Sequence, residues 1–166
     1  PLDATPNGAP GGLGLDPCPE LEKHGGIWRF EADKIGLKQE DGYRIATGIR
    51  SVVGMDWHPL DRHLYVMMHG RDNLHSLFPD RFSAWQNAML PADELIRITE
   101  NGNFGWPYCY YDHFQGRKVL APEYGGDGTV TSRCASKTDP IMAFPAHTAP
   151  NDLLFYTGEQ FPERYR

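Results

Sequence analysis

Apolar residues along the chain occur in short runs separated by glycine, proline and asparagine, and no stretch keeps the spacing of a long amphipathic helix. Short runs bounded by turn residues are typical of β-strands. Pro59 begins a turn between two such runs, and residues 100–103 (ENGN) form a second turn signal. The pattern predicts strands or short apolar segments at 26–33, 51–57, 63–69, 93–99, 104–112, 140–147 and 151–158.

Two segments depart from this pattern. Residues 1–17 alternate proline, glycine and small polar residues, so we expect an extended loop followed by a β-rich domain over residues 18–166. Residues 70–91 carry scattered aromatic residues without a sustained period, which predicts a long loop with a helical turn. Loops this long are usually functional or disordered, and the leucine and aromatic side chains here favour order.

Short strands with turn signals and no long helix indicate an all-β fold. A propeller blade takes about 40 to 50 residues, so this length would supply roughly three blades and would not close a ring. A β-sandwich closes at this length. The last residues, EQFPERYR, resemble the beginning of another strand pair and therefore favour a segment of a larger propeller.

Composition excludes some partners. With 16 basic and 22 acidic residues, the net charge of -6 disfavours nucleic acids and anionic membranes. No apolar run approaches the roughly 20 residues of a membrane span, and the first residues lack the pattern of a signal peptide. We therefore expect a chain with no membrane span.

Three cysteines suggest one crosslink. Cys109 and Cys134 enclose a glycine-rich, charged loop, where a disulfide would stabilise the fold by roughly 3.5 kcal/mol through loop entropy. The alternative is three unrelated reduced thiols. The disulfide implies an oxidising compartment and leaves Cys18 free or paired with a partner outside this sequence.

Eight segments in order carry a resemblance to a known family. They are YRIATGIR (43–50), GMDWHP (54–59), LYVMMHGRD (64–72), LPADELIRI (90–98), NFGWPYCYYD (103–112), LAPEYGGDG (120–128), AHTAPNDLLFYTG (146–158) and QFPERYR (160–166). Together they resemble the soluble glucose/sorbosone dehydrogenases, quinoproteins that use pyrroloquinoline quinone (PQQ) on a six-bladed β-propeller. The sorbosone dehydrogenase-like branch, often periplasmic or secreted, is most similar.

The resemblance implies a cofactor site at the ends of two strands. Arg50 matches the family arginine that contacts the quinone, a role that suits the fixed donor fork of a guanidinium. His69 matches a polar residue beside the cofactor, and Gly70 and Arg71 match positions whose backbone carbonyls bind calcium. Calcium prefers such oxygen ligands and would polarise the quinone. His147 matches a residue near the cofactor's carboxylates.

The implied function is oxidation of a sugar or polyol by PQQ and calcium, with electrons passing to a cytochrome or another acceptor. The family's catalytic histidine base lies upstream of the matched region and further basic cofactor ligands lie downstream, so no catalytic residue is assigned here. We expect this segment alone to be inactive.

One departure favours a different reading. The family usually has asparagine after the arginine, whereas Ser51 follows Arg50 here. A shorter side chain would leave a cofactor contact to water, or would mark a member that no longer catalyses. The alternative function is therefore a non-catalytic extracellular propeller that acts as a binding module. A small self-contained β-sandwich is a third interpretation.

Other polar groups have simpler explanations. His69 and His75 flank Asp72, but a zinc site would need a third ligand at suitable spacing. The GGDG sequence at 125–128 is better explained as a tight turn than as a calcium loop. Asp93 and Glu94 are neighbours on a predicted strand and point to opposite faces, so we expect a solvated edge rather than an acid/base pair.

Four aromatic residues leave two readings open. They follow one another closely in the segment 103–112 and would line a sugar-binding rim or pack between blades: Trp106, Tyr108, Tyr110 and Tyr111.

Overall fold

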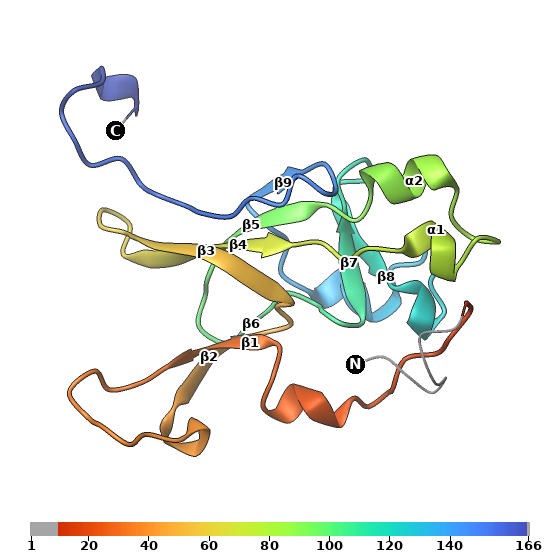
Figure 1. Cartoon of the computed structure of the whole chain (residues 1–166), viewed down its shortest axis with the longest axis horizontal. Coiled ribbons are helices and arrows are strands. Elements are labelled where there is room, and N and C mark those ends of the chain that lie inside the picture. Colours follow the sequence, from red (N-terminus) through yellow and green to blue (C-terminus); the bar gives the residue numbers. More distant parts are fainter. Residues whose placement is uncertain (1–9, 166) are drawn as a thin grey trace.

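The computed structural model describes residues 10–165, and these residues form mostly short strands with a few short helices (Figure 1). The expected all-β class is confirmed at this level, and no closed barrel or propeller is formed within residues 10–165. In chain order the elements are η1 (Pro19–Glu22), β1 (Gly26–Arg29), η2 (Gln39–Asp41), β2 (Tyr43–Thr47), β3 (Ser51–His58), β4 (His63–His69), α1 (Leu74–Leu77), α2 (Ala84–Met89), β5 (Asp93–Arg97), β6 (Gly102–Asn103), β7 (Cys109–Asp112), β8 (Arg117–Leu120), η3 (Pro122–Tyr124), η4 (Ser132–Ser136), β9 (Met142–Phe144) and η5 (Glu163–Tyr165).

The largest sheet has four antiparallel strands in the order β3-β4-β5-β9. β3 and β4 form the predicted hairpin, in which Ser51 pairs with His69 at one end and His58 with His63 at the other. The connecting turn is closed by the backbone N-H of Arg62, which donates to the carbonyl of His58 at 2.9 Å. The hairpin therefore places the end of β4 beside the start of β3.

Two smaller sheets complete the fold. β1 pairs antiparallel with β2, and β2 pairs parallel with the short strand β6. β7 and β8 form a separate antiparallel pair. Residues 104–108, expected to be strand, lead irregularly into β7 at Cys109, while β2 and β8 are strands that the pattern did not single out.

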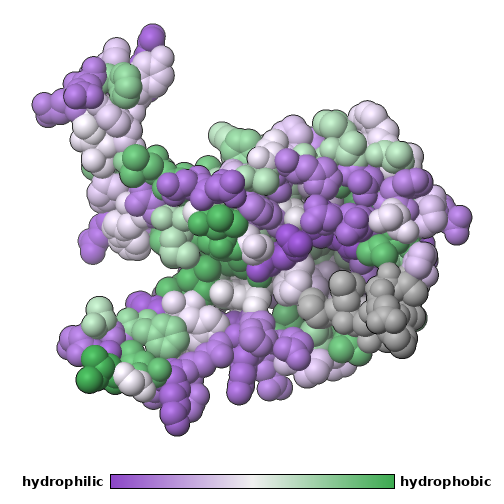
Figure 2. Space-filling view, viewed as in Figure 1, coloured by the Kyte–Doolittle hydropathy of each residue, from purple (hydrophilic) through white to green (hydrophobic). Residues whose placement is uncertain are grey.

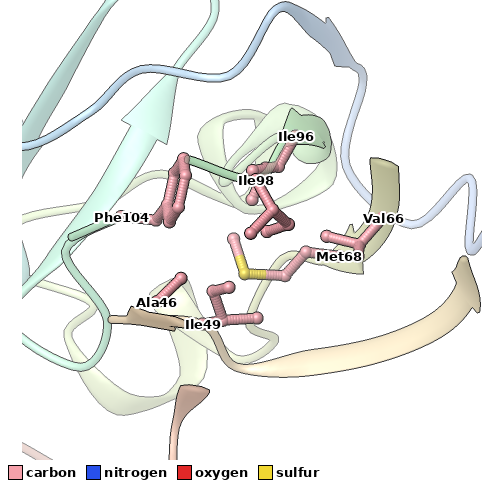
Figure 3. Close-up of a cluster of buried hydrophobic side chains, with 7 residues drawn as sticks. All are labelled: Ala46, Ile49, Val66, Met68, Ile96, Ile98 and Phe104. Carbon is pink, nitrogen blue, oxygen red and sulfur yellow. The ribbon is translucent and has the colours of Figure 1, made fainter. Parts of the chain in front are cut away.

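The main core lies between the four-stranded sheet and the β2–β6 region. Seven buried side chains converge there from β2, β4, β5 and the connecting loops, as Figure 3 shows. They are Ala46, Ile49, Val66, Met68, Ile96, Ile98 and Phe104. Burial of each large aliphatic side chain contributes roughly 1.5 to 3 kcal/mol, so this cluster anchors both sheets.

The segment 70–91 contains two short helices, where one helical turn was expected. α2 begins after Ser83, whose hydroxyl accepts a hydrogen bond from the N-H of Gln86, as a capping residue does. The apolar side chains of the segment form a second buried cluster with β7 and β8: Leu74, Phe78, Phe82, Leu90, Tyr110, Val119 and Ala121. The segment is ordered by this burial.

The prediction of a final strand at 151–158 is wrong, because these residues cross the face of the sheet and join no ladder. At Gly54 the crossing is so close that a Cβ would lie 2.6 Å from the backbone of Asp152. The ring of Phe155 then packs edge-on against His58 and Tyr65. An extended, partly apolar segment can thus be fixed by face contacts instead of strand pairing.

The predicted disulfide between Cys109 and Cys134 is present, and Cys18 is a buried free thiol. The crosslink joins the start of β7 to η4. Within residues 10–165, no helix has the length and apolar character needed to cross a membrane. Of the expected N-terminal loop, residues 1–9 lie outside the described residues.

Candidate functional site

A pocket of about 230 Å³ lies where β4 ends, β5 and β7 begin and β8 leads into η3. This volume is slightly below the usual range of small-molecule sites, roughly 300 to 1,000 Å³. Its walls combine charged and apolar side chains: Arg50, Met68, His69, Gly70, Arg71, Asp72, Asn73, Leu77, Pro91, Ala92, Glu94, Trp106, Pro107, Cys109, Tyr110, Ala121, Glu123 and Tyr124.

Arg50 stands at the mouth of this pocket. Its Nη1 donates to the carbonyl oxygen of Gly70 at 2.8 Å and, less directly, to that of His69 at 3.4 Å. The guanidinium also faces Asp72, with 4.0 Å between Nη2 and Oδ2, and 31% of the side chain is exposed. Its backbone N-H points to the sulfur of Met68 at 3.2 Å, which ties the residue to the core. The charged group is thus held in place and still accessible.

Asp93 fixes two sides of the pocket mouth. Its Oδ1 accepts from the backbone N-H of Gly70 at 2.7 Å, while Oδ2 accepts from the Thr148 hydroxyl at 2.7 Å and from the Ala149 N-H at 2.8 Å. His69 adds a bond from Nε2 to the carbonyl of Pro150 at 3.0 Å. These bonds hold the segment 146–150 against the end of β4.

Gly70 is required by close backbone approach. A Cβ there would lie 2.7 Å from the carbonyl oxygens of both Pro91 and Ala92. No side chain fits at this distance without a shift of the backbone, so the residue permits β4 to end against the start of β5.

His147 closes the outer rim. Its Nε2 donates to the carbonyl of Asn87 at 2.9 Å, and its Nδ1 lies 3.0 Å from Oδ1 of Asp72. The imidazole therefore lies between the Asn87 carbonyl and the Asp72 carboxylate at the rim.

Two glutamates that line the pocket, Glu94 and Glu123, each form an ion pair. Nη1 of Arg71 donates to Oε1 of Glu123, and Nζ of Lys118 donates to Oε2 of Glu94 at 2.7 Å. The Lys118 and Glu94 side chains are only 1% and 3% exposed. Burial raises the pKa of Glu94, although the nearby Lys118 opposes this shift. The expectation that Asp93 and Glu94 form a solvated edge is therefore wrong, because both are buried between the elements that flank β5.

Two of the four aromatic residues of the segment 103–112 line the pocket, and the other two lie outside its lining. Trp106 and Tyr110 line the pocket, together with Tyr124 from η3. Tyr108 instead packs edge-on against Tyr124 at 4.8 Å between ring centres, under the guanidinium of Arg133. Tyr111 lies near the ammonium group of Lys118.

Most of the residues singled out in the sequence meet at this pocket. Arg50, His69, Gly70 and Arg71 line it, and His147 reaches its rim through Asp72. Ser51 pairs with His69 across the hairpin but is exposed and lies outside the lining. Glu123 was not predicted as a pocket residue, and Glu94 was predicted to be solvated, because no periodicity marks either residue as facing a pocket.

Metal binding by side chains finds no support among residues 10–165. No group of three or more His, Cys, Asp or Glu side chains is arranged to hold an ion there. His75 bonds through Nδ1 to the carbonyl of Phe82, away from Asp72. Asp127, in the GGDG sequence, accepts from Thr129 and Val130 N-H groups and closes a tight turn, as expected.

The fold and pocket define a mostly β-sheet protein with a small pocket at strand ends. The family model described as TrAA12-like matches residues 25–162, and the chain belongs to this family. An uncharacterized protein of Borreliella burgdorferi is 31% identical over 133 residues, which cover 79% of this chain and 30% of that relative. No solved structure matches the chain.

These matches correct the family assignment made from sequence motifs. Membership of the soluble glucose/sorbosone dehydrogenase family was wrong, because the matching family is TrAA12-like and the relative's name carries no such activity. The eight motifs are short and rich in turn and aromatic residues, which many β-proteins share.

Proposed function

We propose that the chain is part of an oxidoreductase that oxidises a sugar or polyol with pyrroloquinoline quinone bound at this pocket. The observation that carries the proposal is that Arg50, His69 and Arg71 line one pocket and that His147 lies at its rim. Arg50 and His147 are nearly 100 positions apart in sequence, and the fold brings them to one pocket.

Arg50 places a positive charge at the mouth of the pocket, beside Asp72, and this charge suits an anionic, planar cofactor. PQQ carries carboxylates and quinone oxygens, and when bound it would accept the electrons of the substrate. Arg50 would hold quinone oxygens with its donor fork and favour negative charge on them. His147, at the rim, would face the carboxylates. Trp106 and Tyr110 would supply apolar contact.

Calcium fits this pocket less directly. The carbonyl oxygen of Gly70, a proposed calcium ligand, already accepts a hydrogen bond from Arg50. A divalent cation on the same oxygen would lie beside the guanidinium charge and be repelled. We include calcium in the proposal on the condition that Arg50 leaves this oxygen for the anionic cofactor. The second proposed ligand is the carbonyl of Arg71.

The remaining parts of the proposal concern the whole protein. The sheet β3-β4-β5-β9 has the strand number of one propeller blade, which supports a six-bladed propeller assembled with further sequence. The disulfide supports a periplasmic or secreted location. Electrons would pass to a cytochrome or another acceptor. The chain spans 30% of the length of its relative, so the catalytic base is not assigned to any residue here.

Calorimetric titration with PQQ, with and without calcium, tests the proposal. We expect micromolar, calcium-dependent binding that weakens at least tenfold in Arg50→Ala, because the fork of charge-assisted donors is lost. The matched control is Arg62→Ala, an exposed arginine in the β3–β4 turn. Absence of binding to the unaltered protein would sink the proposal.

One observation favours a second function. Arg50 already occupies the carbonyl oxygen of Gly70, a proposed calcium ligand, and Ser51 lies outside the pocket lining. This arrangement suits a propeller that binds a small molecule extracellularly without catalysis. Saturable binding of a sugar together with no affinity for PQQ would favour this function.

A further inference from the structure

Two polar atoms in the pocket wall are buried and have no hydrogen-bond partner. Among residues 10–165, neither Oε2 of Glu123 nor Oη of Tyr110 has a partner, and these two residues are 4% and 5% exposed. Both residues line the pocket. Buried polar groups in native proteins nearly always have a hydrogen-bond partner. Two such atoms without one at the same cavity therefore indicate that a bound molecule supplies the partner.

Glu123 is held so that only one of its oxygens is committed. Arg71 binds Oε1, and the backbone carbonyl of Glu123 accepts from the N-H of Gly14 at 2.9 Å. Pro122 precedes it in η3 and is itself buried. Arg71 thus holds the carboxylate, the bond from Gly14 holds the backbone of the same residue, and Oε2 is left as an acceptor.

The charges around Oε2 select the kind of donor. Arg71 already balances Glu123, and Lys118 balances Glu94 across the same pocket. A cationic ligand would meet the Arg71 charge, and an anionic ligand would meet the carboxylate. A neutral hydroxyl group donates to Oε2 without either penalty. The nearby Trp106 and Pro107 offer apolar surface to C-H groups.

We infer that Oε2 of Glu123 accepts a hydrogen bond from a hydroxyl group of a neutral sugar or polyol in this pocket, and that Glu123 thereby determines substrate specificity. The inference rests on the proposed function for its substrate class, but it concerns binding that needs no cofactor. Glu123 is assigned no proton transfer.

Calorimetric titration with glucose and with sorbitol, in the absence of PQQ, tests this inference. We expect saturable binding that weakens roughly tenfold to hundredfold in Glu123→Gln, because the amide presents a donor or leaves Arg71 without its acceptor. The matched control is Glu31→Gln, an exposed glutamate distant from the pocket lining, and we expect it to bind as the unaltered protein does. Equal affinity in Glu123→Gln would overturn the inference.

A series of ligands gives a test that needs no substitution. Each monodeoxy glucose lacks one hydroxyl group. With the unaltered protein, we expect the analogue that lacks the hydroxyl bound by Glu123 to bind about tenfold or more weakly than glucose. Uniform affinity across all deoxy analogues, or stronger binding of glucosamine than of glucose, would contradict a neutral hydroxyl donor. Sugar binding without PQQ binding would support this inference and contradict the proposed function. PQQ binding without sugar binding would support the proposed function and contradict this inference.

Discussion

A single carboxylate, that of Asp93, holds together the backbone segments around the pocket mouth. Asp93 joins the end of β4 to the segment 146–150 through three hydrogen bonds from Gly70, Thr148 and Ala149. None of these residues lies within 20 positions of Asp93, so its role follows from the fold. Arg50 and His69 keep their positions at the pocket mouth because this carboxylate fixes the backbone around them.

Asp61 provides a pH-dependent contact at the far end of the β3–β4 hairpin. The Tyr65 hydroxyl, followed by the backbone N-H of His63, holds the pKa of Asp61 below its usual value. A depressed folded-state pKa stabilises the fold above the unfolded pKa of about 3.9, and this contribution is lost as pH falls through the folded pKa.

We predict that the thermal midpoint falls between about pH 5 and pH 3, and that the fall is smaller in Asp61→Asn, which cannot lose this charge. Circular dichroism melts across this range provide the measurement. Asp33→Asn, at an exposed position, is the control. An identical fall in Asp61→Asn and the unaltered protein would assign the acid sensitivity to other groups.

At the residue scale, sequence reasoning located the cations of the site but not its acids. Arg50 and His69 are visible at strand ends in a hairpin whose register is set by alternation and turn chemistry. Glu123 becomes a pocket residue only through Arg71, 52 positions away. Glu94 seemed solvated because its partner Lys118 is 24 positions distant and on another sheet. Contacts of that range leave no local pattern.

At the scale of elements, β5 and β8 are joined by a buried ion pair. Glu94 on β5 and Lys118 on β8 belong to different sheets, and the pair is the charged connection between them in the pocket wall. Breaking such a pair leaves one charge buried without compensation.

We predict that Lys118→Met lowers the free energy of unfolding by about 3 to 5 kcal/mol, and that adding Glu94→Leu restores most of this loss. Denaturant unfolding of both variants measures the difference. Lys34→Met, at an exposed position, controls for the loss of a positive charge. A double variant that is no more stable than Lys118→Met would indicate that packing, and not the unpaired carboxylate, sets the cost.

Strands were predictable where local pattern and pairing agree. The β3–β4 hairpin and β5 follow from apolar runs and turn residues, and the structure has them at nearly the expected residues. Residues 151–158 also form an apolar run bounded by turn residues, but they cross the sheet face. Gly54 lets their backbone approach, and Asp56 accepts a hydrogen bond from the Phe155 N-H at 2.7 Å. β8 was missed since its Arg-Lys-Val-Leu sequence lacks alternation.

At the scale of the molecule, the three sheets form a body from which two parts project. The loop between β1 and β2 extends to one side, and the chain beyond β9 runs along the main sheet and then away from it (Figure 1). In the space-filling view, apolar residues gather in the indentation between the β1–β2 arm and the four-stranded sheet (Figure 2). On β3, Val53, Met55 and Trp57 are about half exposed, at alternate positions on one face.

The disulfide contributes to the stability of the whole molecule. Cys109 and Cys134 are 25 positions apart, and the loop they close includes β8, η3 and η4. We predict that Cys109→Ala/Cys134→Ala lowers the free energy of unfolding by roughly 3.5 kcal/mol, through the entropy of the unfolded chain. Denaturant unfolding without reductant measures this loss. A loss below about 1 kcal/mol would show that the loop is ordered without the crosslink.

Cys18 gives access to a different property, the kinetics of opening. Its side chain is 5% exposed, and its backbone N-H donates to the Tyr108 hydroxyl at 3.1 Å. With the other two cysteines joined, it is the one thiol that a solvent reagent can modify. The reagent reaches this thiol only when the segment before β1 detaches. The modification rate therefore measures local opening of that segment, which requires less free energy than global unfolding.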